Sequence, residues 1–420
     1  MKVLIVGGGI GGLTAALSLH AAGIAAEVYE AVPEIRPLGV GINLLPHAVR
    51  ELTELGLQDR LAATAIATRE LIYANRHGQE IWREERGLEA GYRWPQFSIH
   101  RGRLQAILFA AAAERLGPGR LHADRRLVRF DQDGRAVRAV FRDAGGGEHV
   151  AAGDLMIAAD GIHSAVRAAF FPDEGPPKWN GRILWRATTE GEPFLSGRSM
   201  VMAGHENQKF VCYPICRETA ARGRSLINWI AELRVDDRTL RRREDWNRRG
   251  DLADFLPRFE SWDFGWLKVP DVIRGAEAVY EFPMVDRDPL PAWTRGRVTL
   301  LGDAAHPMYP IGSNGASQAI LDARILAFRL ATAPTIEAAL AAYEEERRPA
   351  TARIVLANRA NGPEQVMQLV ETRAPQGFTD RDAVISREEM EAYARDYKRI
   401  AGFDRDALNS RPSLSVDRAG

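Results

Sequence analysis

The first thirty residues alternate between short apolar runs and a segment rich in glycine and alanine. Residues 3–6 form a β-like apolar run, and after a glycine-rich turn the segment 13–22 has the Ala/Leu composition of a helix. Gly23 is suited to the C-terminal cap of that helix, and residues 26–30 form a second strand-like run. This order predicts a strand, a helix and a strand, the start of a nucleotide-binding type of α/β fold.

The apolar pattern continues in the same style to about residue 171. It predicts helices over 46–57 and 100–116, a hairpin over 126–143 with its turn at Asp133-Gly134, and a buried strand over 154–161 followed by a helix. From 180 to 282 the pattern changes to short alternating strands rich in Trp, Tyr and Val, which predicts a mainly antiparallel sheet. We interpret the charged segment 238–256 as a helical insert in that sheet.

Residues 296–306 again contain an apolar run of the kind that predicts a buried strand, as near the N-terminus. A helical pattern over 336–361 is interrupted at Pro349. The last twenty residues are polar and lack a period, which is typical of a loose tail. We therefore predict an α/β fold in which a discontinuous nucleotide-binding domain is interrupted by an antiparallel-sheet domain and followed by a helical C-terminal segment. The predicted bounds are 1–172 and 285–360 for the first domain, with 76–99 as a segment that either domain could hold, 173–284 for the second, and 361–420 for the C-terminal helix and tail.

Composition narrows the classes of partner. The 56 Lys and Arg residues balance the 56 Asp and Glu residues among 420, which argues against nucleic acid or an anionic membrane as a partner. No apolar run approaches the ~20 residues of a bilayer span, and the N-terminal run is too short for a signal peptide. Cys212 and Cys216 are too few for a disulfide framework, so we expect a reducing cytoplasm, and no metal site is predicted.

The glycine-rich turn carries the first chemical signal. Gly7, Gly9 and Gly12 fit the G-x-G-x-x-G pattern, in which backbone N–H groups approach a pyrophosphate at a helix N-terminus. Glu30 ends the second strand eighteen residues beyond Gly12, where its carboxylate can accept from the 2′-hydroxyl of an adenosine ribose. The alternative is a glycine turn without a ligand.

Two further stretches end a strand with an acid. Asp160-Gly161 follows the strand at 154–159, and a helix cap by Asp160 would explain it as well as a ligand would. Asp303 ends the strand near residue 300 and is followed by no Asp, Glu, Lys or Arg from Ala304 to Leu321. A helix beginning near Ala316 would bring partial positive charge to this uncharged region. Such surroundings suit a planar heterocycle that becomes anionic on reduction, with Asp303 on a polyol, as in a flavin and its ribityl chain.

The three motifs in this order resemble the class A flavoprotein monooxygenases, the aromatic hydroxylase family. The segments "IRPLGVGIN", "SIHRG", "ADGIHSAVR", "PMVDRDPLP" and "YPIGSNGASQAILD" are similar to those of its phenazine-hydroxylase branch. The salicylate-hydroxylase type more often has Gln at Asn314 and Glu at Leu321, which favours the phenazine branch. The resemblance covers roughly residues 1 to 360, and nothing is carried over beyond them.

The resemblance implies roles for individual residues. At the nucleotide end of FAD it places Gly7, Gly9, Gly11 and Gly12 on the diphosphate, Glu30 on the adenosine ribose, and the backbone of Val128 on adenine. At the flavin end it places Arg101 and Gln105 on the ribityl-phosphate side, Asp303 on the ribityl chain, and Gly312, Asn314, Gly315 and Ala316 along the flavin ring. Asp160 and Gly161 match a motif linked to both FAD and NAD(P)H. Pro310 would place its carbonyl near the substrate. No catalytic acid or base is assigned, and His306 is more simply a packed loop histidine than a proton relay.

The activity implied is FAD-dependent hydroxylation of a small aromatic substrate through a flavin C4a-hydroperoxide, with NADH or NADPH and O₂ as co-substrates. The substrate could be a phenazine carboxylate that loses CO₂, and the alternatives are another aromatic acid of hydroxybenzoate or quinolone type, a nicotinamide dehydrogenase, or a non-enzymatic flavin-binding module. Trp185, Tyr213 and Trp229 lie on strands of the middle domain and are candidates for the substrate pocket, although aromatic side chains more often pack in a core. Arg186 could meet a carboxylate, but strand alternation places it opposite Trp185, so both cannot face the ligand. The sequence leaves the oligomeric state open.

Overall fold

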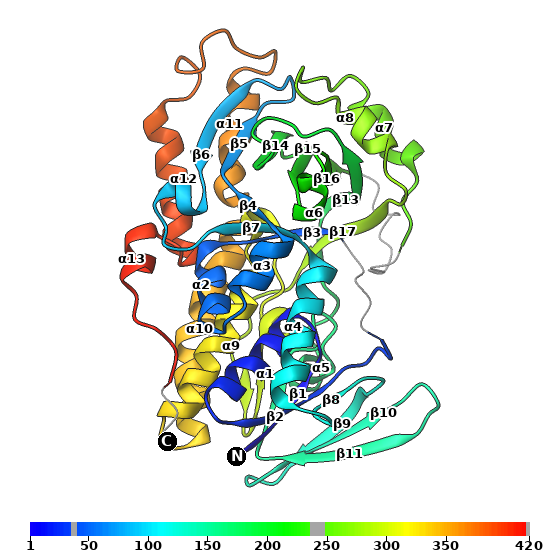
Figure 1. Ribbon diagram of the computed structural model, residues 1–420, viewed down its shortest axis with the longest axis vertical. Helices are drawn as coiled ribbons and strands as arrows, with labels where there is room; N and C mark the ends of the chain where they lie inside the picture. The colour runs from blue at the N-terminus through cyan, green and yellow to red at the C-terminus, as the bar shows by residue number, and fades with distance from the viewer. Residues whose placement is uncertain (35–39, 236–247, 417–420) are drawn as a thin grey trace.

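The computed structural model describes residues 1–34, 40–235 and 248–416, and arranges them around two large sheets (Figure 1). The first sheet has six strands in the order β18 (Thr294–Arg295), β19 (Val298–Leu300), β12 (Leu155–Ala158), β1 (Lys2–Val6), β2 (Ala25–Tyr29) and β8 (Leu121–His122). The five strands from β19 to β8 are parallel, and only β18 pairs antiparallel. The sheet therefore brings three distant parts of the chain to one carboxyl-end edge, which is where ligands bind in such folds.

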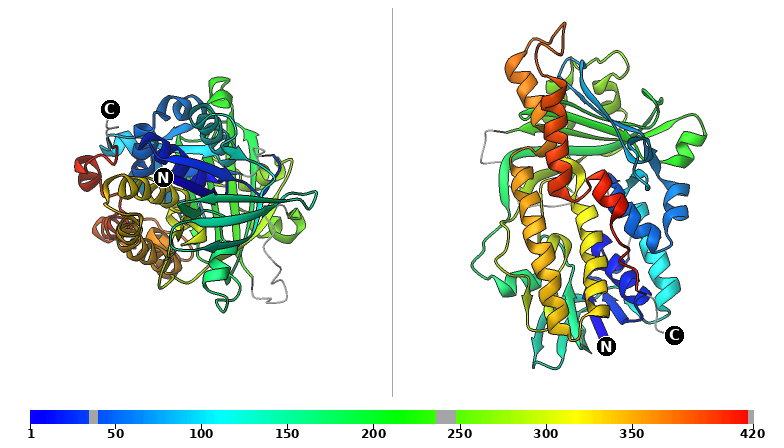
Figure 2. Two further views of the ribbon diagram at one scale, coloured as in Figure 1. Left: turned by 90° about the horizontal axis from the view of Figure 1, so that it is seen from below. Right: turned by 90° about the vertical axis from the view of Figure 1, so that its left-hand side faces the viewer.

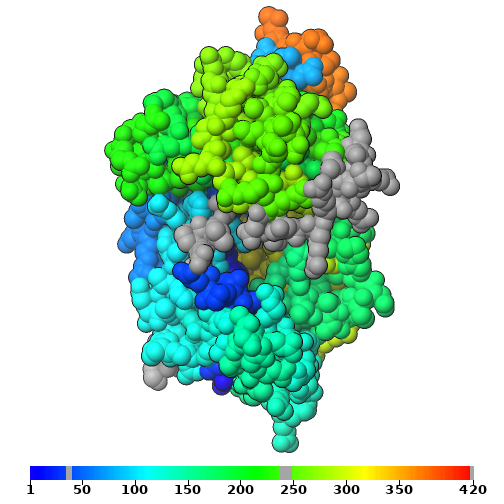
Figure 3. All heavy atoms as spheres, turned by 90° about the vertical axis from the view of Figure 1, so that its right-hand side faces the viewer, coloured from blue at the N-terminus to red at the C-terminus, as the bar shows by residue number. Residues whose placement is uncertain are grey.

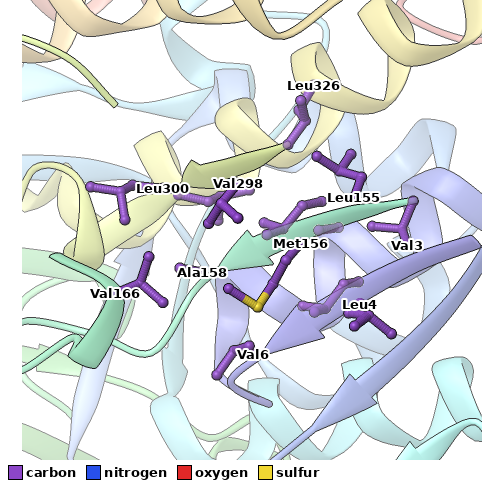
Figure 4. Close-up of a cluster of buried hydrophobic side chains, with 14 of the residues drawn as sticks. Val3, Leu4, Val6, Leu155, Met156, Ala158, Val166, Val298, Leu300 and Leu326 are labelled. Atoms are coloured by element: carbon purple, nitrogen blue, oxygen red, sulfur yellow. The ribbon is translucent and has the colours of Figure 1, made fainter. Parts of the chain in front are cut away.

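The centre of this sheet is apolar on both faces, as expected for parallel strands covered on each side. Figure 4 shows side chains of β1, β12 and β19 gathered with Leu326 of α9 (Gly315–Thr332) and Val166 of α5 (Ala165–Phe170). Helix α1 (Ile10–Ala21) is buried on two sides: Ala16 packs toward the sheet, and Leu13 packs toward an outer helical layer. A helix that is apolar all round fits this sandwiched position.

The outer layer consists of α2 (Pro46–Glu54), α3 (Gln58–Thr64) and α4 (Arg101–Leu116), which pack with α1 and the start of α9. The long helix α10 (Ile336–Arg359) packs along α9, and its Leu340 and Tyr343 join the apolar cluster of the sheet. The prediction that Pro349 interrupts this helix is wrong, because α10 continues through it as one helix of 24 residues. The missing N–H and the steric demand of proline disfavour this locally. Buried side chains on both sides of Pro349, such as Tyr343 and Ile354, hold the two halves in one line.

The second large sheet has seven strands in the order β17 (Tyr280–Asp286), β13 (Lys178–Gly191), β16 (Ser225–Arg234), β15 (Gln208–Pro214), β14 (Ser199–His205), β5 (Glu70–Ala74) and β6 (Glu80–Glu85). All neighbours pair antiparallel except β14 and β5. Two small sheets complete the fold, one of β9 (Arg126–Gln132), β10 (Val137–Arg142) and β11 (Glu148–Gly153), the other of β3 (Gly41–Leu44), β7 (Gln96–His100) and β4 (Ile66–Thr68). Thus β5 and β6, far earlier in the chain, extend the sheet of the middle domain.

One face of the seven-stranded sheet is covered by α7 (Leu252–Phe259) and α8 (Val269–Arg274), which lie in the upper part of the surface shown in Figure 3, above the β9–β11 sheet. Here aromatic side chains from the sheet and α7 form a closed core with aliphatic side chains of α8. The predicted charged helical insert at 238–256 falls largely on residues 236–247, outside the described residues, and α7 begins only at Leu252.

The C-terminal segment forms α11 (Gln365–Arg373), α12 (Arg387–Ala401) and α13 (Arg405–Ser410), and α12 runs beside the upper part of α10 (Figure 2). The prediction of a loose tail is wrong as far as residue 416. Arg50 donates to the carbonyl oxygens of Arg411 and Pro412 at 2.8 and 2.6 Å, and Arg411 donates to Glu51 at 2.5 Å. These partners come from α2 and therefore could not be inferred from the composition of the tail. Among the described helices, none is long and apolar enough to cross a bilayer.

Candidate active site

The glycine turn after β1 is built by close backbone contacts. Gly7 has φ of +106°, and a Cβ on it would stand 2.3 Å from the Ala159 carbonyl oxygen. A Cβ on Gly12 would stand 2.0 Å from the Gly7 carbonyl oxygen, so only glycine allows the turn and α1 to meet. The space at Gly9, at the N-terminus of α1, is open, because nothing lies within 4 Å of a Cβ there. The turn therefore leaves room for a ligand at the helix end.

Two predicted residues converge on this turn from other elements. Glu30, at the end of β2, accepts from the Gly8 N–H at 2.7 Å, and Gln105 of α4 donates to the Gly8 carbonyl at 2.8 Å. Arg101, at the start of the same helix, is exposed and borders a cavity that lies between this turn and the seven-stranded sheet. Glu30 and Gln105 thus meet the glycine turn at the carboxyl edge of the six-stranded sheet, and Arg101 borders the same cavity as Gly9.

The sequence left two roles open for Asp160, a helix cap and a ligand contact, and its two carboxylate oxygens differ in this respect. One oxygen, Oδ2, accepts from the Ala165 N–H at 2.8 Å and caps the start of α5. The other, Oδ1, is buried and has no hydrogen-bond partner among the described residues. Burial raises the pKa of Asp160, although hydrogen bonds from Ser164 and neighbouring N–H groups oppose the effect. A helix cap accounts for only one of the two oxygens, and the following Gly161 borders the cavity.

The third predicted motif lies opposite, at the end of β19. Asp303 opens onto the cavity, where restricted access to water raises its pKa against the opposing influence of His306 and Arg101. Gly315 and Ala316 also border the cavity and begin α9, which has no acidic residue in its first turn. An 18-residue helix therefore directs its positive end at this space. The arrangement suits a group that carries negative charge.

His306 is not a proton relay into this cavity. It is buried with its Nε2 atom 2.5 Å from Oδ2 of Asp322, whose Oδ1 accepts from Arg347 at 2.7 Å. Burial alone would raise the pKa of Asp322, but His306 and Arg347 outweigh it and lower this pKa to about 2. Because Asp322 also accepts from the Gly302 N–H at 3.1 Å, the ion pair fixes the turn that carries Asp303.

The cavity between these motifs and the seven-stranded sheet has a volume of about 390 Å³. Its first wall contains the glycine turn, Gly161, Asp303 and the loop from Pro310 to Ala316. The open space at Gly9 fits the phosphates of FAD, the carboxylate of Asp303 its polyol, and the N-terminus of α9 its ring. These residues agree with an FAD site.

Two predicted cofactor residues lie elsewhere. Val128 is on β9, where it is 37% exposed and does not border the cavity. Gly312 belongs to the loop, but its Cα faces away from the cavity, since a Cβ there would stand 2.1 Å from the phenol oxygen of Tyr397. The predicted roles of both concern backbone atoms and remain predictions.

The second wall is one face of the seven-stranded sheet. Strand register places Arg186 opposite Ile230, Ile230 opposite Val211, and Val211 opposite Met202, and all four side chains border the cavity. Tyr213, two residues after Val211 in β15, also borders the cavity and donates to the Gly41 carbonyl at 3.0 Å. The wall is therefore an apolar floor with a guanidinium at one end.

Trp185 and Trp229 do not belong to this wall. Both face the aromatic core under α7 and α8, where the Trp185 ring stacks on Phe255 at 4.8 Å and the Trp229 N–H donates to Thr189 at 2.9 Å. They pack in a core, as the sequence favoured, and do not border the cavity for which they were candidates, because α7 and α8 cover their face of the sheet. Alternation itself is confirmed, since Arg186 and Trp185 lie on opposite faces.

Arg186 lacks an acidic partner among residues 1–34, 40–235 and 248–416. It donates to the Gly41 carbonyl at 3.0 Å, its Nε atom has no partner within those residues, and it forms no ion pair with them. Burial lowers the pKa of Arg186, Tyr213 opposes this, and the nearby charge of Arg101 adds to it. A cation placed in this way favours an anionic ligand.

Lys209, by contrast, is already paired. Its ammonium lies 2.9 Å from Glu232 and 2.6 Å from Glu364, and all three side chains are buried and border the cavity. Burial alone would lower the pKa of Lys209, but the two carboxylates raise it. Sequence reasoning missed this cluster, because Glu364 lies 155 positions from Lys209 and no local pattern relates them.

Comparisons with known proteins show the family and its cofactor. The family model described as "FAD binding domain" matches residues 1–244 and 281–358. The phenazine 1,6-dicarboxylic acid hydroxylase PhzS of Lysobacter antibioticus is 47% identical over 361 residues, which cover 85% of this chain and 89% of that protein. The aurachin C monooxygenase/isomerase of Stigmatella aurantiaca is 31% identical and covers 83% and 85%, respectively. The crystal structure of Klebsiella pneumoniae HpxO with FAD and uric acid superposes with a TM-score of 0.73 over 98% of this chain and 97% of that one, at 24% identity, and supports the fold alone.

Proposed function

Because the chain belongs to the FAD-binding-domain family of aromatic monooxygenases, we propose that it hydroxylates a flat aromatic carboxylate, with a phenazine carboxylate as the preferred candidate. NAD(P)H is the proposed reductant and O₂ the proposed oxidant. The observation that carries the proposal is Arg186, a cation without an acidic partner in the described residues, at the edge of an apolar floor inside the cavity. The 47% identity to a phenazine hydroxylase supports the choice of ring system.

FAD would be held along the first wall. The N–H groups at Gly9 and Gly11 would bind the diphosphate, Glu30 the adenosine ribose, Asp303 the ribityl chain, and the backbone from Asn314 to Ala316 the flavin ring. When bound, FAD supplies the redox chemistry, accepting hydride from NAD(P)H and activating O₂ for transfer of one oxygen atom to the ring. The positive end of α9 stabilises negative charge at this place, and the uncharged loop after Asp303 adds none of its own.

The substrate would lie on the second wall. Arg186 would bind its carboxylate, with the Tyr213 phenol beside it, while Ile230, Val211 and Met202 support the ring and exclude water. This fixes the ring against the first wall, where Pro310 borders the same cavity. The protein thereby provides orientation and a dry site rather than a catalytic acid or base.

We further propose that attack at the carbon bearing the carboxylate releases CO₂. The balance is one aromatic carboxylate, one NAD(P)H, one O₂ and two protons, giving the phenol, CO₂, NAD(P)⁺ and water. In this reaction the carbon–carboxylate bond breaks and its electron pair restores the aromatic ring. Hydroxylation at an unsubstituted carbon, which retains the carboxylate, is the alternative product.

The test is product mass. Purified protein loaded with FAD is incubated with NADH plus NADPH, O₂ and phenazine-1-carboxylate, 5-methylphenazine-1-carboxylate or phenazine-1,6-dicarboxylate, and the products are analysed by mass spectrometry. Loss of CO₂ with gain of one oxygen supports decarboxylating hydroxylation, and gain of oxygen alone supports simple hydroxylation. Release of H₂O₂ with all three compounds unchanged would reject the phenazines and direct the search to hydroxybenzoates and quinolones.

A pair of neighbouring variants tests the binding mode. Arg186→Met removes the proposed carboxylate anchor, whereas Trp185→Phe changes the adjacent residue on the opposite face of β13. The proposal requires that only the first raises KM for the acid strongly. Equal KM values for Arg186→Met and the wild type would remove Arg186 from the substrate site.

A further inference from the structure

The loop that forms the ring end of the cavity has an unusual backbone. Between Pro310 and α9, two consecutive residues have left-handed torsions, Gly312 with φ of +67° and Ser313 with φ of +57°. Glycine adopts this conformation readily, but serine seldom does. Such a turn persists only where surrounding structure holds it in place. The question is which residue does so.

Tyr397 of α12 is placed to do this. Its phenol oxygen accepts from the Asn314 Nδ2 group at 2.9 Å, and it lies 2.8 Å from Oδ1 of Asn358 and 3.2 Å from the Ile311 carbonyl oxygen, either of which can accept its proton. The side chain is 5% exposed, and burial raises the pKa of Tyr397 above its ordinary value, so the hydroxyl remains a donor. One hydroxyl therefore joins the residues on either side of the left-handed pair.

The ring of Tyr397 fits tightly behind the same turn. A Cβ on Gly312 would stand 2.4 Å from the ring carbon Cζ, and a Cβ on Gly362 would stand 3.0 Å from Cε2. The phenol thus lies between two glycines that leave space for it. The loop has Tyr397 on one side and the cavity, bordered by Ser313 and Asn314, on the other.

Other bonds extend the same support. Asn358 of α10 donates to the Tyr309 carbonyl at 3.0 Å, and Gln318 of α9 donates both to Asn314 Oδ1 at 3.2 Å and to the Ala401 carbonyl at the end of α12 at 3.0 Å. The start of the loop is therefore connected to α10 through Asn358, and Ile311 and Asn314 are connected to α12 through Tyr397. The match to the family model ends at residue 358, so it includes neither Tyr397 nor Ala401.

We propose that Tyr397 is a positioning residue that fixes the backbone of residues 311–316 at the FAD site. Through that backbone it sets how tightly FAD binds and how completely NAD(P)H oxidation is coupled to hydroxylation. The first consequence rests on family membership alone, whereas the second also rests on the proposed function. The helix α12, which contributes no residue to the cavity lining, thereby acts on the reaction.

Tyr397→Phe removes the hydroxyl and keeps the ring. Tyr393→Phe removes a hydroxyl from the same helix, but among the described residues that hydroxyl forms no hydrogen bond with the loop. Each apoprotein is titrated with FAD by fluorescence, and H₂O₂ is measured as a fraction of NAD(P)H consumed. Loss of one or two hydrogen bonds predicts about 5- to 30-fold weaker FAD binding and a larger H₂O₂ fraction for Tyr397→Phe, with Tyr393→Phe near wild type.

Three results would overturn the inference. The first is an unchanged FAD Kd and H₂O₂ fraction in Tyr397→Phe, even if its Tm falls, because that would show a role in stability alone. The second is an equal shift in both variants, which would mean general loosening of α12. The third is weaker FAD binding with an unchanged H₂O₂ fraction, which would overturn the proposal that Tyr397 affects the coupling of NAD(P)H oxidation to hydroxylation. If the wild type hydroxylates no acid offered, the proposed function fails, while the FAD titration still decides the role of Tyr397.

Discussion

The two faces of the seven-stranded sheet consist of alternate residues of the same strands, and they have opposite chemistry. One face carries Trp185, Phe210 and Trp229 into an aromatic core closed by α7 and α8. The other carries Arg186 and Lys209 into a cavity that also borders the proposed FAD site. The strand geometry is identical for both. What differs is the element that covers each face.

The comparison shows how charge is handled on the cavity face. Lys209 is paired with Glu232 and Glu364, so its charge is already compensated within the protein. Arg186 has no such partner among the described residues, and its charge is left for a ligand. Lys209 therefore contributes to the structure of the protein itself, whereas the partly buried Arg186 is available to a ligand.

The largest effect expected is on the core face. Trp229→Ala should lower the free energy of unfolding by about 3–5 kcal/mol, because it opens a cavity in the aromatic core and leaves Thr189 without the indole N–H. Urea denaturation measures this value. KM for the acid should stay within a factor of about two of wild type at temperatures where the variant is folded, since the side chain faces away from the cavity. A large rise in KM would contradict the separation of the two faces.

A comparable loss of stability should follow from Lys209→Met on the cavity face. The change leaves two carboxylates, Glu232 and Glu364, buried without their ammonium, for a loss of about 3–5 kcal/mol. Arg186→Met is the matched control, because it removes a cation that has no carboxylate partner in the described chain, and its unfolding free energy should stay within about 1 kcal/mol of wild type. Equal destabilisation by the two changes would mean that Arg186 also has a structural partner.

The next largest effect is expected at Arg186 and concerns the affinity for the substrate instead of the stability of the fold. Arg186→Met should weaken binding of the aromatic acid by about 1.5–3 kcal/mol, roughly 10- to 150-fold in Kd, since a hydrogen bond to a charged group has that strength. Isothermal titration with the acid in the absence of NAD(P)H measures it. The corresponding uncharged aromatic compound provides the control, and its affinity should change little. Parallel losses for acid and uncharged compound would show that Arg186 shapes the pocket instead of binding a carboxylate.

The smallest effect is expected for Tyr213→Phe. Its phenol donates to the Gly41 carbonyl. Removing the hydroxyl should therefore reduce the free energy of unfolding, or that of substrate binding, by about 1 kcal/mol. Burial raises the pKa of Tyr213 to about 12. The contribution of the protonated phenol is therefore fully present below pH 10 and is lost only as pH rises toward 12. The ratio of KM values between variant and wild type should be constant from pH 6.5 to 9, and a slope in that range would contradict a buried donor.

Several parts of this molecule follow from local sequence. The strand, glycine turn, helix and Glu30 are predicted together because backbone contacts at Gly7 and Gly12 exclude any other residue, and such constraints act within a few positions. Alternation likewise separates Arg186 from Trp185 without any knowledge of the fold. The absence of charged residues from Ala304 to Leu321 likewise predicts an uncharged loop and helix start beside Asp303, because the sequence shows directly which residues carry charge.

Only the tertiary structure decided which face of the middle sheet meets the cavity. The aromatic residues Trp185 and Trp229 would suit a substrate pocket or a core equally well, and the choice depends on where α7 and α8 pack. The cluster of Lys209 with Glu364 and the contact of Tyr397 with the loop at Gly312 likewise join segments far apart in the chain. Local periodicity carries no record of these pairings, because they arise from the packing of whole elements.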